Sequence, residues 1–172
     1  MPVIDKEKKT EKRREEGRVK KQKKKYLQEI LERKKVTKVT KGGRQFSFTS
    51  LLLLKDKEEK KISFSYKKGK KMLDAFRKSQ REAQKKLISY FDDKIPYSIP
   101  FNITVEYKST KIIFKSTPKG SGIKAGGIVS KIFKYLEIKN VSAKIIGSRN
   151  RLNVIRACFL ALDTMTRKKY RY

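Results

Sequence analysis

The stretch Gln45-Phe-Ser-Phe-Thr-Ser-Leu51 decides the fold of the first half of this chain, because apolar and polar residues alternate in it from Gln45 to Thr49. Such a period of two places Phe46 and Phe48 on one face of a half-buried β-strand. The preceding run, Val36 to Lys41, alternates more weakly, and Gly42-Gly43 separates the two. The pattern predicts two strands around a glycine turn.

Further along, Ile62-Ser-Phe-Ser-Tyr66 alternates again after the polar turn Lys55-Asp-Lys-Glu-Glu-Lys-Lys61. Apolar residues then recur at helical spacing, with cations between them. These residues are Met72, Leu73, Phe76, Ala83 and Leu87. The sequence predicts a sheet with one helix on it, a lobe that ends near Asp92-Asp93.

A second lobe follows the prolines Pro96 and Pro100. Two runs predict strands, Phe101 to Tyr107 and Lys111 to Ser116, and Ala143 to Ile146 predicts a third. Helical spacing predicts two helices, the second capped by Ser148 or Asn150. Their apolar residues are Ile128, Val129, Ile132, Phe133 and Leu136, then Leu152, Ile155, Phe159, Leu162 and Met165. The lobe is β-β-α-β-α, and the fold class is α+β.

The first 35 residues differ in composition, with 15 Lys and Arg, 7 Asp and Glu, and few apolar residues before Tyr26. Such a segment buries too little surface to fold alone, so we expect disorder. Leu27, Ile30 and Leu31 have helical spacing, and residues 20–35 could form a helix on a partner. The expected division is 1–35 tail, 36–95 first lobe, 96–166 second lobe and 167–172 basic tail.

The net charge of the chain limits the classes of molecule that it can be expected to bind. Lys and Arg number 48 against 17 Asp and Glu, a net charge of +31. A compact chain tolerates that excess mainly when a polyanion neutralises it. Nucleic acid and an anionic membrane are the two candidate polyanions. The membrane is the weaker candidate, since no apolar run approaches the ~18 residues that span a bilayer. The N-terminus has no apolar segment of a secretory signal.

The chain lacks the usual catalytic residues. It has no His, and its one cysteine, Cys158, is predicted to be a small core residue on a helix. We therefore expect no enzyme activity, no metal and no cofactor.

Three segments are candidates for phosphate contact. Lys41-Gly-Gly-Arg44 combines a tight turn with flanking cations, although an ordinary hairpin on a basic protein would look the same. Gly120-Ser-Gly-Ile-Lys-Ala-Gly-Gly127 precedes a helix, whose free N–H groups favour anions. Gly147-Ser-Arg-Asn-Arg-Leu-Asn153 lies at the start of the last predicted helix. Helix capping would explain Ser148 and Asn150 but not Arg149 and Arg151, which could contact phosphates or base edges.

These segments, in this order and extended to Thr40–Leu51 and Gly147–Ala157, closely resemble the ribosomal protein S5 family. The resemblance runs from about Val36 to Met165. It implies a first lobe like a double-stranded RNA-binding domain and a second lobe with a left-handed βαβ crossover. Two departures are the Lys55–Lys60 turn and the run Ser63–Lys68, where the family is glycine-rich. Arg151 stands where a proline is common.

The resemblance also implies a function, which is to bind small-subunit rRNA near the central pseudoknot and to support assembly. The protein would lie beside ribosomal proteins S4 and S8 and the path of incoming mRNA, and would influence decoding accuracy. The loop Lys38–Arg44 would reach helix 34 of that rRNA. We expect a bacterial or organellar ribosome, no membrane and no homo-oligomer. The expected rRNA-binding residues are Lys38, Lys41, Gly42, Gly43, Arg44, Lys119, Gly120, Gly122, Lys124, Gly126, Gly127, Ser148, Arg149, Asn150, Arg151, Asn153 and Arg156.

Two other functions fit parts of the sequence. A small-molecule kinase of the galactokinase–homoserine kinase superfamily would share the fold of the second lobe and a glycine-rich loop. Such an enzyme would not require a net charge of +31. A free double-stranded RNA-binding regulator would need only the first lobe, which leaves the two later motifs unexplained.

Overall fold

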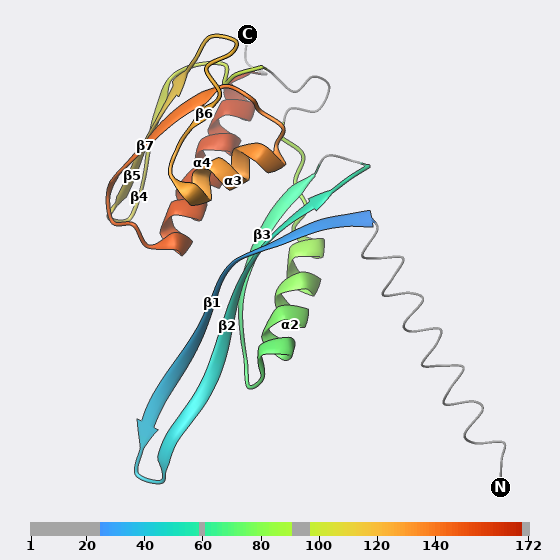
Figure 1. The fold of residues 1–172 in the computed structure, drawn as a ribbon, viewed down its shortest axis with the longest axis vertical. Coiled ribbons are helices and arrows are strands. Elements are labelled where there is room, and N and C mark those ends of the chain that lie inside the picture. The colour runs from blue at the N-terminus through green and yellow to red at the C-terminus, as the bar shows by residue number, and fades with distance from the viewer. Residues whose placement is uncertain (1–24, 59–60, 91–96, 170–172) are drawn as a thin grey trace, which may run out of the picture.

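The computed structural model describes residues 25–58, 61–90 and 97–169. The first lobe is an antiparallel sheet of order β1-β2-β3, formed by β1 (Tyr26–Thr40), β2 (Gly43–Asp56) and β3 (Ile62–Gly69). Helix α2 (Met72–Lys85) lies on one face of this sheet (Figure 1). The predicted hairpin, third strand and helix are all present, although the side chain of Leu73 is 67% exposed.

The sheet is buried on both faces around its central strand. Leu52 and Leu54 pack toward α2, with Ala83, while Leu51 and Leu53 pack on the opposite face. All four leucines are at most 1% exposed. Continuous apolar runs are typical of strands covered on both sides, and four consecutive leucines fit such a strand.

The structure corrects the expected tail. Residues 26–35 are neither disordered nor helical but belong to β1, which pairs with β2 from Tyr26↔Asp56 to Thr40↔Gly43. The register shifts between Ile30 and Glu32, as at a β-bulge. The expectation for residues 1–24 lies outside the described residues.

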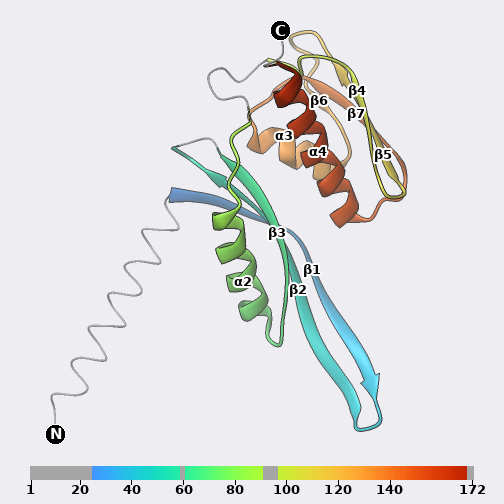
Figure 2. The ribbon, with the colours of Figure 1, turned by 180° about the vertical axis from the view of Figure 1, so that it is seen from behind.

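The second lobe is a four-stranded mixed sheet of order β4-β5-β7-β6 with two helices (Figure 2). Its elements in chain order are β4 (Ile103–Tyr107), β5 (Thr110–Ser116), β6 (Ile123–Lys124), α3 (Gly127–Tyr135), β7 (Val141–Gly147) and α4 (Arg151–Lys169). Only β6 was not predicted; it is two residues long and pairs in parallel with β7. Helix α4 extends to Lys169, so the expected tail at 167 begins inside it.

One apolar core joins the two lobes. Leu31, Leu51 and Leu53 of the first lobe belong to the same buried cluster as the inner faces of α3 and α4. The rings of Phe64 in β3 and Phe159 in α4 have centroids 4.7 Å apart. The first sheet therefore lies between α2 on one side and the second lobe on the other.

Polar contacts of β1 and β2 reinforce this interface. Glu29 Oε1 lies 2.6 Å from Lys131 Nζ, and Lys55 Nζ lies 2.5 Å from Glu137 Oε1. Burial, and secondarily the Glu29 carboxylate, raises the pKa of Tyr135 to about 12. The first half of β1 thus helps fix the position of one lobe on the other.

Candidate nucleic-acid interface

The glycine pair forms the tip of the β1–β2 hairpin. Thr40 pairs with Gly43 around the two-residue turn Lys41–Gly42, and the Thr40 hydroxyl donates to the Gly43 carbonyl at 2.9 Å. Gly43 has a φ of +116°, a conformation that side chains rarely adopt. A Cβ atom at either glycine would meet nothing within 4 Å. The tip is therefore open, and another backbone can approach it closely.

The outer part of the hairpin is a ribbon of two strands, because β3 pairs with β2 only from Phe48 onward. With Arg33–Lys35, which adjoin it on β1 opposite the last residues of β2 that β3 pairs with, this ribbon comprises residues 33–47 and carries six cations and no acidic residue. They are Arg33, Lys34, Lys35, Lys38, Lys41 and Arg44, all exposed. Figure 1 shows the ribbon projecting away from both lobes.

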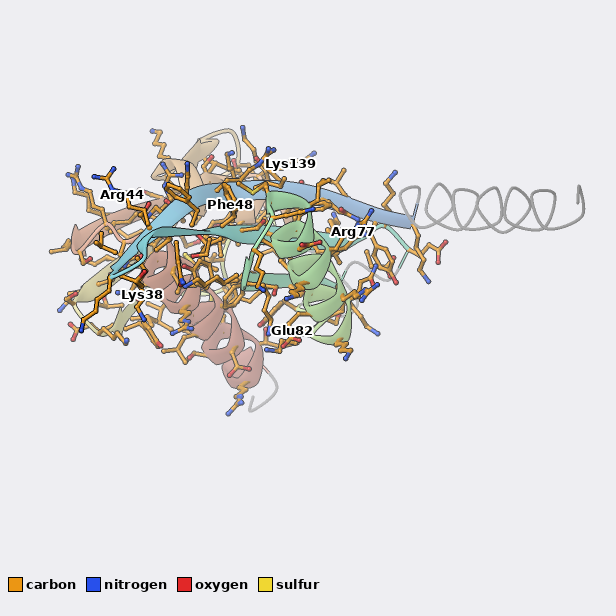
Figure 3. The ribbon with its side chains drawn as sticks, turned by 90° about the horizontal axis from the view of Figure 1, so that it is seen from below. Lys38, Arg44, Phe48, Arg77, Glu82 and Lys139 are labelled. Atoms are coloured by element: carbon orange, nitrogen blue, oxygen red, sulfur yellow. The ribbon has the colours of Figure 1, made fainter. Side chains whose placement is uncertain are left out.

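The two faces of the ribbon both carry positive charge. Lys38 and Arg44 lie near its end and extend on opposite sides (Figure 3), since Arg44 pairs with Val39 and Lys38 pairs with Gln45. Phe46 is 49% exposed, with Lys35 Nζ 3.8 Å from its ring centroid. Cations beside an exposed aromatic ring suit RNA, which offers phosphates and base faces.

The first part of the glycine-rich loop is fixed by the protein itself. Gly120 and Gly122 have φ values of +90° and +71°. Their N–H groups donate to Oδ1 of Asn140 at 3.1 and 3.2 Å, and Asn140 Nδ2 donates to the Tyr97 carbonyl at 3.0 Å. These two amides therefore hold the loop in shape, contrary to our expectation that they face an anion. Asn140 was not predicted.

The second part of that loop is open. Gly126 is the N-cap of α3 and Gly127 its first residue; both are exposed, and no side chain caps the helix. A Cβ atom at Gly126 would lie 3.1 Å from Ile145 Cδ1, whereas one at Gly127 would meet nothing within 4 Å. Free N–H groups and the positive end of the helix dipole favour an anion here.

The start of α4 is built by local hydrogen bonds. Asn150 Oδ1 accepts from the Leu152 N–H at 3.1 Å, so Asn150 is the cap, and the Ser148 N–H donates to the Ser109 carbonyl at 2.9 Å. Gly147 has a φ of +80°, and a Cβ there would lie only 2.4 Å from that same carbonyl oxygen. Ser148, Asn150 and Gly147 are thus explained by the fold.

Of the arginines in and after this segment, one is exposed to solvent and two contact other parts of the protein. Arg149 is exposed. Arg151 instead donates from Nη1 to the Leu31 carbonyl at 3.1 Å, with its Nε 3.5 Å from Glu32 Oε1, and so ties α4 to β1. Arg156 Nη1 donates to Tyr107 Oη at 2.9 Å. Arg151 and Arg156, both predicted to bind rRNA, thus also make contacts within the protein.

Two of the three predicted segments meet at one hollow of about 410 Å³. The α3 start supplies Gly126 and Gly127, and the segment before α4 supplies Arg149 and Arg151. Lys144 of β7, which was not predicted, joins them. Figures 1 and 2 place the tip of the β1–β2 hairpin apart from the second lobe, to which α3, β7 and α4 belong. Of the other predicted residues, Lys119 and Lys124 are exposed and Asn153 is partly exposed.

Cys158 lies buried in the core, as predicted. Burial raises the pKa of the Cys158 thiol, which disfavours the thiolate that a nucleophile requires. In residues 25–58, 61–90 and 97–169, no three His, Cys, Asp or Glu are grouped so as to hold a metal ion. No helix in these ranges is long and apolar enough to cross a membrane. The fold and site define a two-lobe α+β protein with cationic surfaces suited to nucleic acid.

Comparison with known proteins gives the family. The model of the ribosomal protein S5 N-terminal domain matches residues 26–89, and that of the S5 C-terminal domain matches residues 105–170. The small ribosomal subunit protein uS5c of Thalassiosira pseudonana is 35% identical over 152 residues, covering 85% of this chain and 84% of its own. The uS5 protein of Protochlamydia amoebophila is 33% identical over 138 residues, covering 80% and 81%. The chain belongs to the uS5 family of small-subunit ribosomal proteins.

This result bears on several predictions. The N-terminal match begins at residue 26, where β1 begins, and not at residue 36. Relatives come from bacteria and plastids, in agreement with the predicted location in a small ribosomal subunit of a bacterium or an organelle. The match to both lobes also explains the two later motifs, which a free double-stranded RNA-binding regulator would not.

Proposed function

We propose that this chain is a structural constituent of the small ribosomal subunit that binds rRNA near the central pseudoknot. It has no catalytic role in this proposal. It supports assembly, lies beside ribosomal proteins S4 and S8 and the path of incoming mRNA, and influences decoding accuracy. The family assignment and the basic ribbon together support this function.

The observation that carries the proposal is the ribbon of residues 33–47. It projects from the body, contains six cations and no acid, and ends at the glycine pair Gly42 and Gly43, where a Cβ atom would meet nothing within 4 Å. Because β3 does not pair with this part, little of the fold depends on its side chains. The positive charge of the ribbon is therefore best explained by phosphates that approach it. The hollow lined by Gly127 and Arg149 offers a second site of contact with RNA.

Salt dependence of rRNA binding tests the proposal. Each neutralised phosphate contributes a slope of about 0.9 on duplex and about 0.7 on single strands when log affinity is plotted against log salt. Six to ten contacts imply a loss of about three to five decades between 50 and 200 mM salt. A slope equivalent to one or two contacts would contradict RNA scaffolding.

A triple variant locates the contacts. Lys38→Gln, Lys41→Gln and Arg44→Gln together should reduce the slope by about two to three units. The matched control removes three exposed cations of α2 by Lys78→Gln, Arg81→Gln and Lys85→Gln, and should change the slope less. Equal effects would mean that RNA responds only to total charge and not to the ribbon.

A further inference from the structure

Strand β3 has a free outer edge. At its start, the Ile62 N–H and the Ile88 N–H each donate to the other residue's carbonyl, at 3.0 and 3.2 Å. Hydrogen-bonding direction alternates along a strand, so Phe64 and Tyr66 present their N–H and C=O groups to the same outer side as Ile62. By the same alternation, Ser63 and Ser65 direct their backbone N–H and C=O groups toward β2, where they lie opposite Leu54 and Leu52. Within residues 25–58, 61–90 and 97–169, no backbone group pairs with the outer side of Phe64 or Tyr66.

A groove of about 350 Å³ runs along this edge. Five consecutive residues of β3, Ser63 to Lys67, line it, which is possible only where the edge itself faces the groove. One wall is formed by Glu82 of α2 and by Lys86, the residue after the helix; Glu82 is marked in Figure 3. Helix α4 forms the other wall with Leu152, Arg156 and Phe159. An added strand would thus be covered on both faces.

The wall on the α2 side is cationic. Lys86 Nζ lies 2.7 Å and Lys67 Nζ 3.7 Å from the Glu82 carboxylate, so one acid faces two lysines. Hydrogen bonding to Lys86, and then the charge of Lys67, lowers the pKa of Glu82. On the same face of β3, Ser65 is 3% exposed and its hydroxyl has no hydrogen-bond partner among the described residues. This wall suits a carboxylate.

The wall on the α4 side is mainly apolar. It consists of Phe64, Leu152 and Phe159, with the Arg156 guanidinium turned to Tyr107. At the groove, Ile88 is 50% and Tyr66 41% exposed. Exposed apolar side chains around a concave surface are typical of a binding site.

We propose that this groove binds an extended polypeptide segment of a partner protein, which adds to β3 as the fourth strand of the β1–β2–β3 sheet. Side chains of a strand alternate between its faces. The partner segment therefore alternates acidic residues, toward Lys67 and Lys86, with apolar residues, toward Phe64 and Phe159.

Other occupants fit the groove less well. RNA has no repeating N–H and C=O groups with which to continue a sheet. Residues 1–24 carry 11 Lys and Arg against 5 Asp and Glu and would meet a wall of their own charge. A second copy of this edge would bring its own lysines against Lys67 and Lys86.

The test uses the full chain and a fluorescent hexapeptide in which Glu and Val alternate. Its isomer, with three Glu followed by three Val, has the same charge and composition and controls for attraction to a basic protein. We expect the alternating peptide to bind at least about tenfold more tightly, because only it places acids and valines on opposite walls. In amide exchange, Phe64 and Tyr66 should become protected on binding.

Charge reversal tests the site itself. Lys67→Glu with Lys86→Glu should weaken the alternating peptide about threefold to tenfold, as expected for two exposed ion pairs. Lys85→Glu, a neighbouring exposed lysine outside the groove, should have less effect. Equal binding of both isomers, or no protection at Phe64 and Tyr66, would overturn the proposal. Displacement of the peptide by an rRNA fragment, with protection of the same two amides by RNA, would assign the groove to RNA instead.

Discussion

Gly127→Val separates an RNA-binding role of the glycine-rich loop from a role in folding. Gly127 is the first residue of α3, and a Cβ there meets nothing within 4 Å. Helix propensity favours Val over Gly by a few tenths of a kcal/mol. The free protein should therefore unfold within about 1 °C of the unsubstituted chain. If RNA approaches the open start of α3, however, three added carbon atoms obstruct it.

Gly147→Ala is the matched comparison, because its cost is structural. A side chain at positive φ costs about 1–2 kcal/mol, and the 2.4 Å approach to the Ser109 carbonyl oxygen forces a further adjustment. A total of about 2–3 kcal/mol would lower the melting temperature of a chain this size by about 5–10 °C. This variant should lose stability first and RNA binding only through it.

Both quantities are measured for each variant, by thermal unfolding of the free protein and by incorporation into small subunits at a permissive temperature. We expect Gly127→Val to assemble poorly with an unchanged melting temperature, and Gly147→Ala to melt early but assemble. A large drop in melting temperature for Gly127→Val with normal assembly would show that its loop serves the fold and would refute the reasoning.

Three further predictions concern the fold. Amide exchange of the free protein should show protection of alternate amides from Tyr26 through Lys35, because β1 is an edge strand that pairs with β2 on one side; rapid exchange of all these amides would contradict the strand. Arg151→Ala removes the contacts to Leu31 and Glu32, so it should cost about 1 kcal/mol and lower the melting temperature by about 2–4 °C, measured by calorimetry. Burial raises the pKa of Tyr90 and Tyr135 from 10.0 to about 12, so the free energy of unfolding should be unaffected by these groups below pH 10 and fall as pH rises from 10 to 12; a flat alkaline profile in denaturant titrations would contradict their burial.

Regular patterning made much of the fold predictable. Strict alternation located β2 and β3, and helical spacing located α2, α3 and α4. In these segments local preference and tertiary burial agree, so the periodicity is undisturbed. The glycine turn between β1 and β2 was predictable because its conformation requires glycine at Gly43.

The first half of β1 was not predictable for a specific reason. Leu27, Ile30 and Leu31 have the spacing of a helix, yet they lie on a strand whose register shifts between Ile30 and Glu32. Ile30 packs toward α2, whereas Leu31 enters the core shared with the second lobe. The charges of this half, Glu29 and Glu32 among them, looked like a solvated tail but contact the second lobe.

The sequence did not reveal the role of residues whose contacts lie far away along the chain. Asn140 fixes the loop at Gly120 and Gly122, 20 and 18 positions earlier, and no local pattern marks it. Arg151 reaches Leu31 across 120 positions. A sequence shows that such residues are polar or charged, but only the packing of the lobes decides whether they contact RNA or protein.

Sedimentation of a tagged copy from cell or organelle extract tests the central claim most directly. At low salt, the protein should migrate with small ribosomal subunits, and ribonuclease treatment should release it to the top of the gradient. The ribbon variant Lys38→Gln, Lys41→Gln and Arg44→Gln should be partly released at a lower salt concentration than the α2 control. A protein that remains at the top of the gradient at low salt, or that migrates in large complexes unaffected by ribonuclease, would contradict the account.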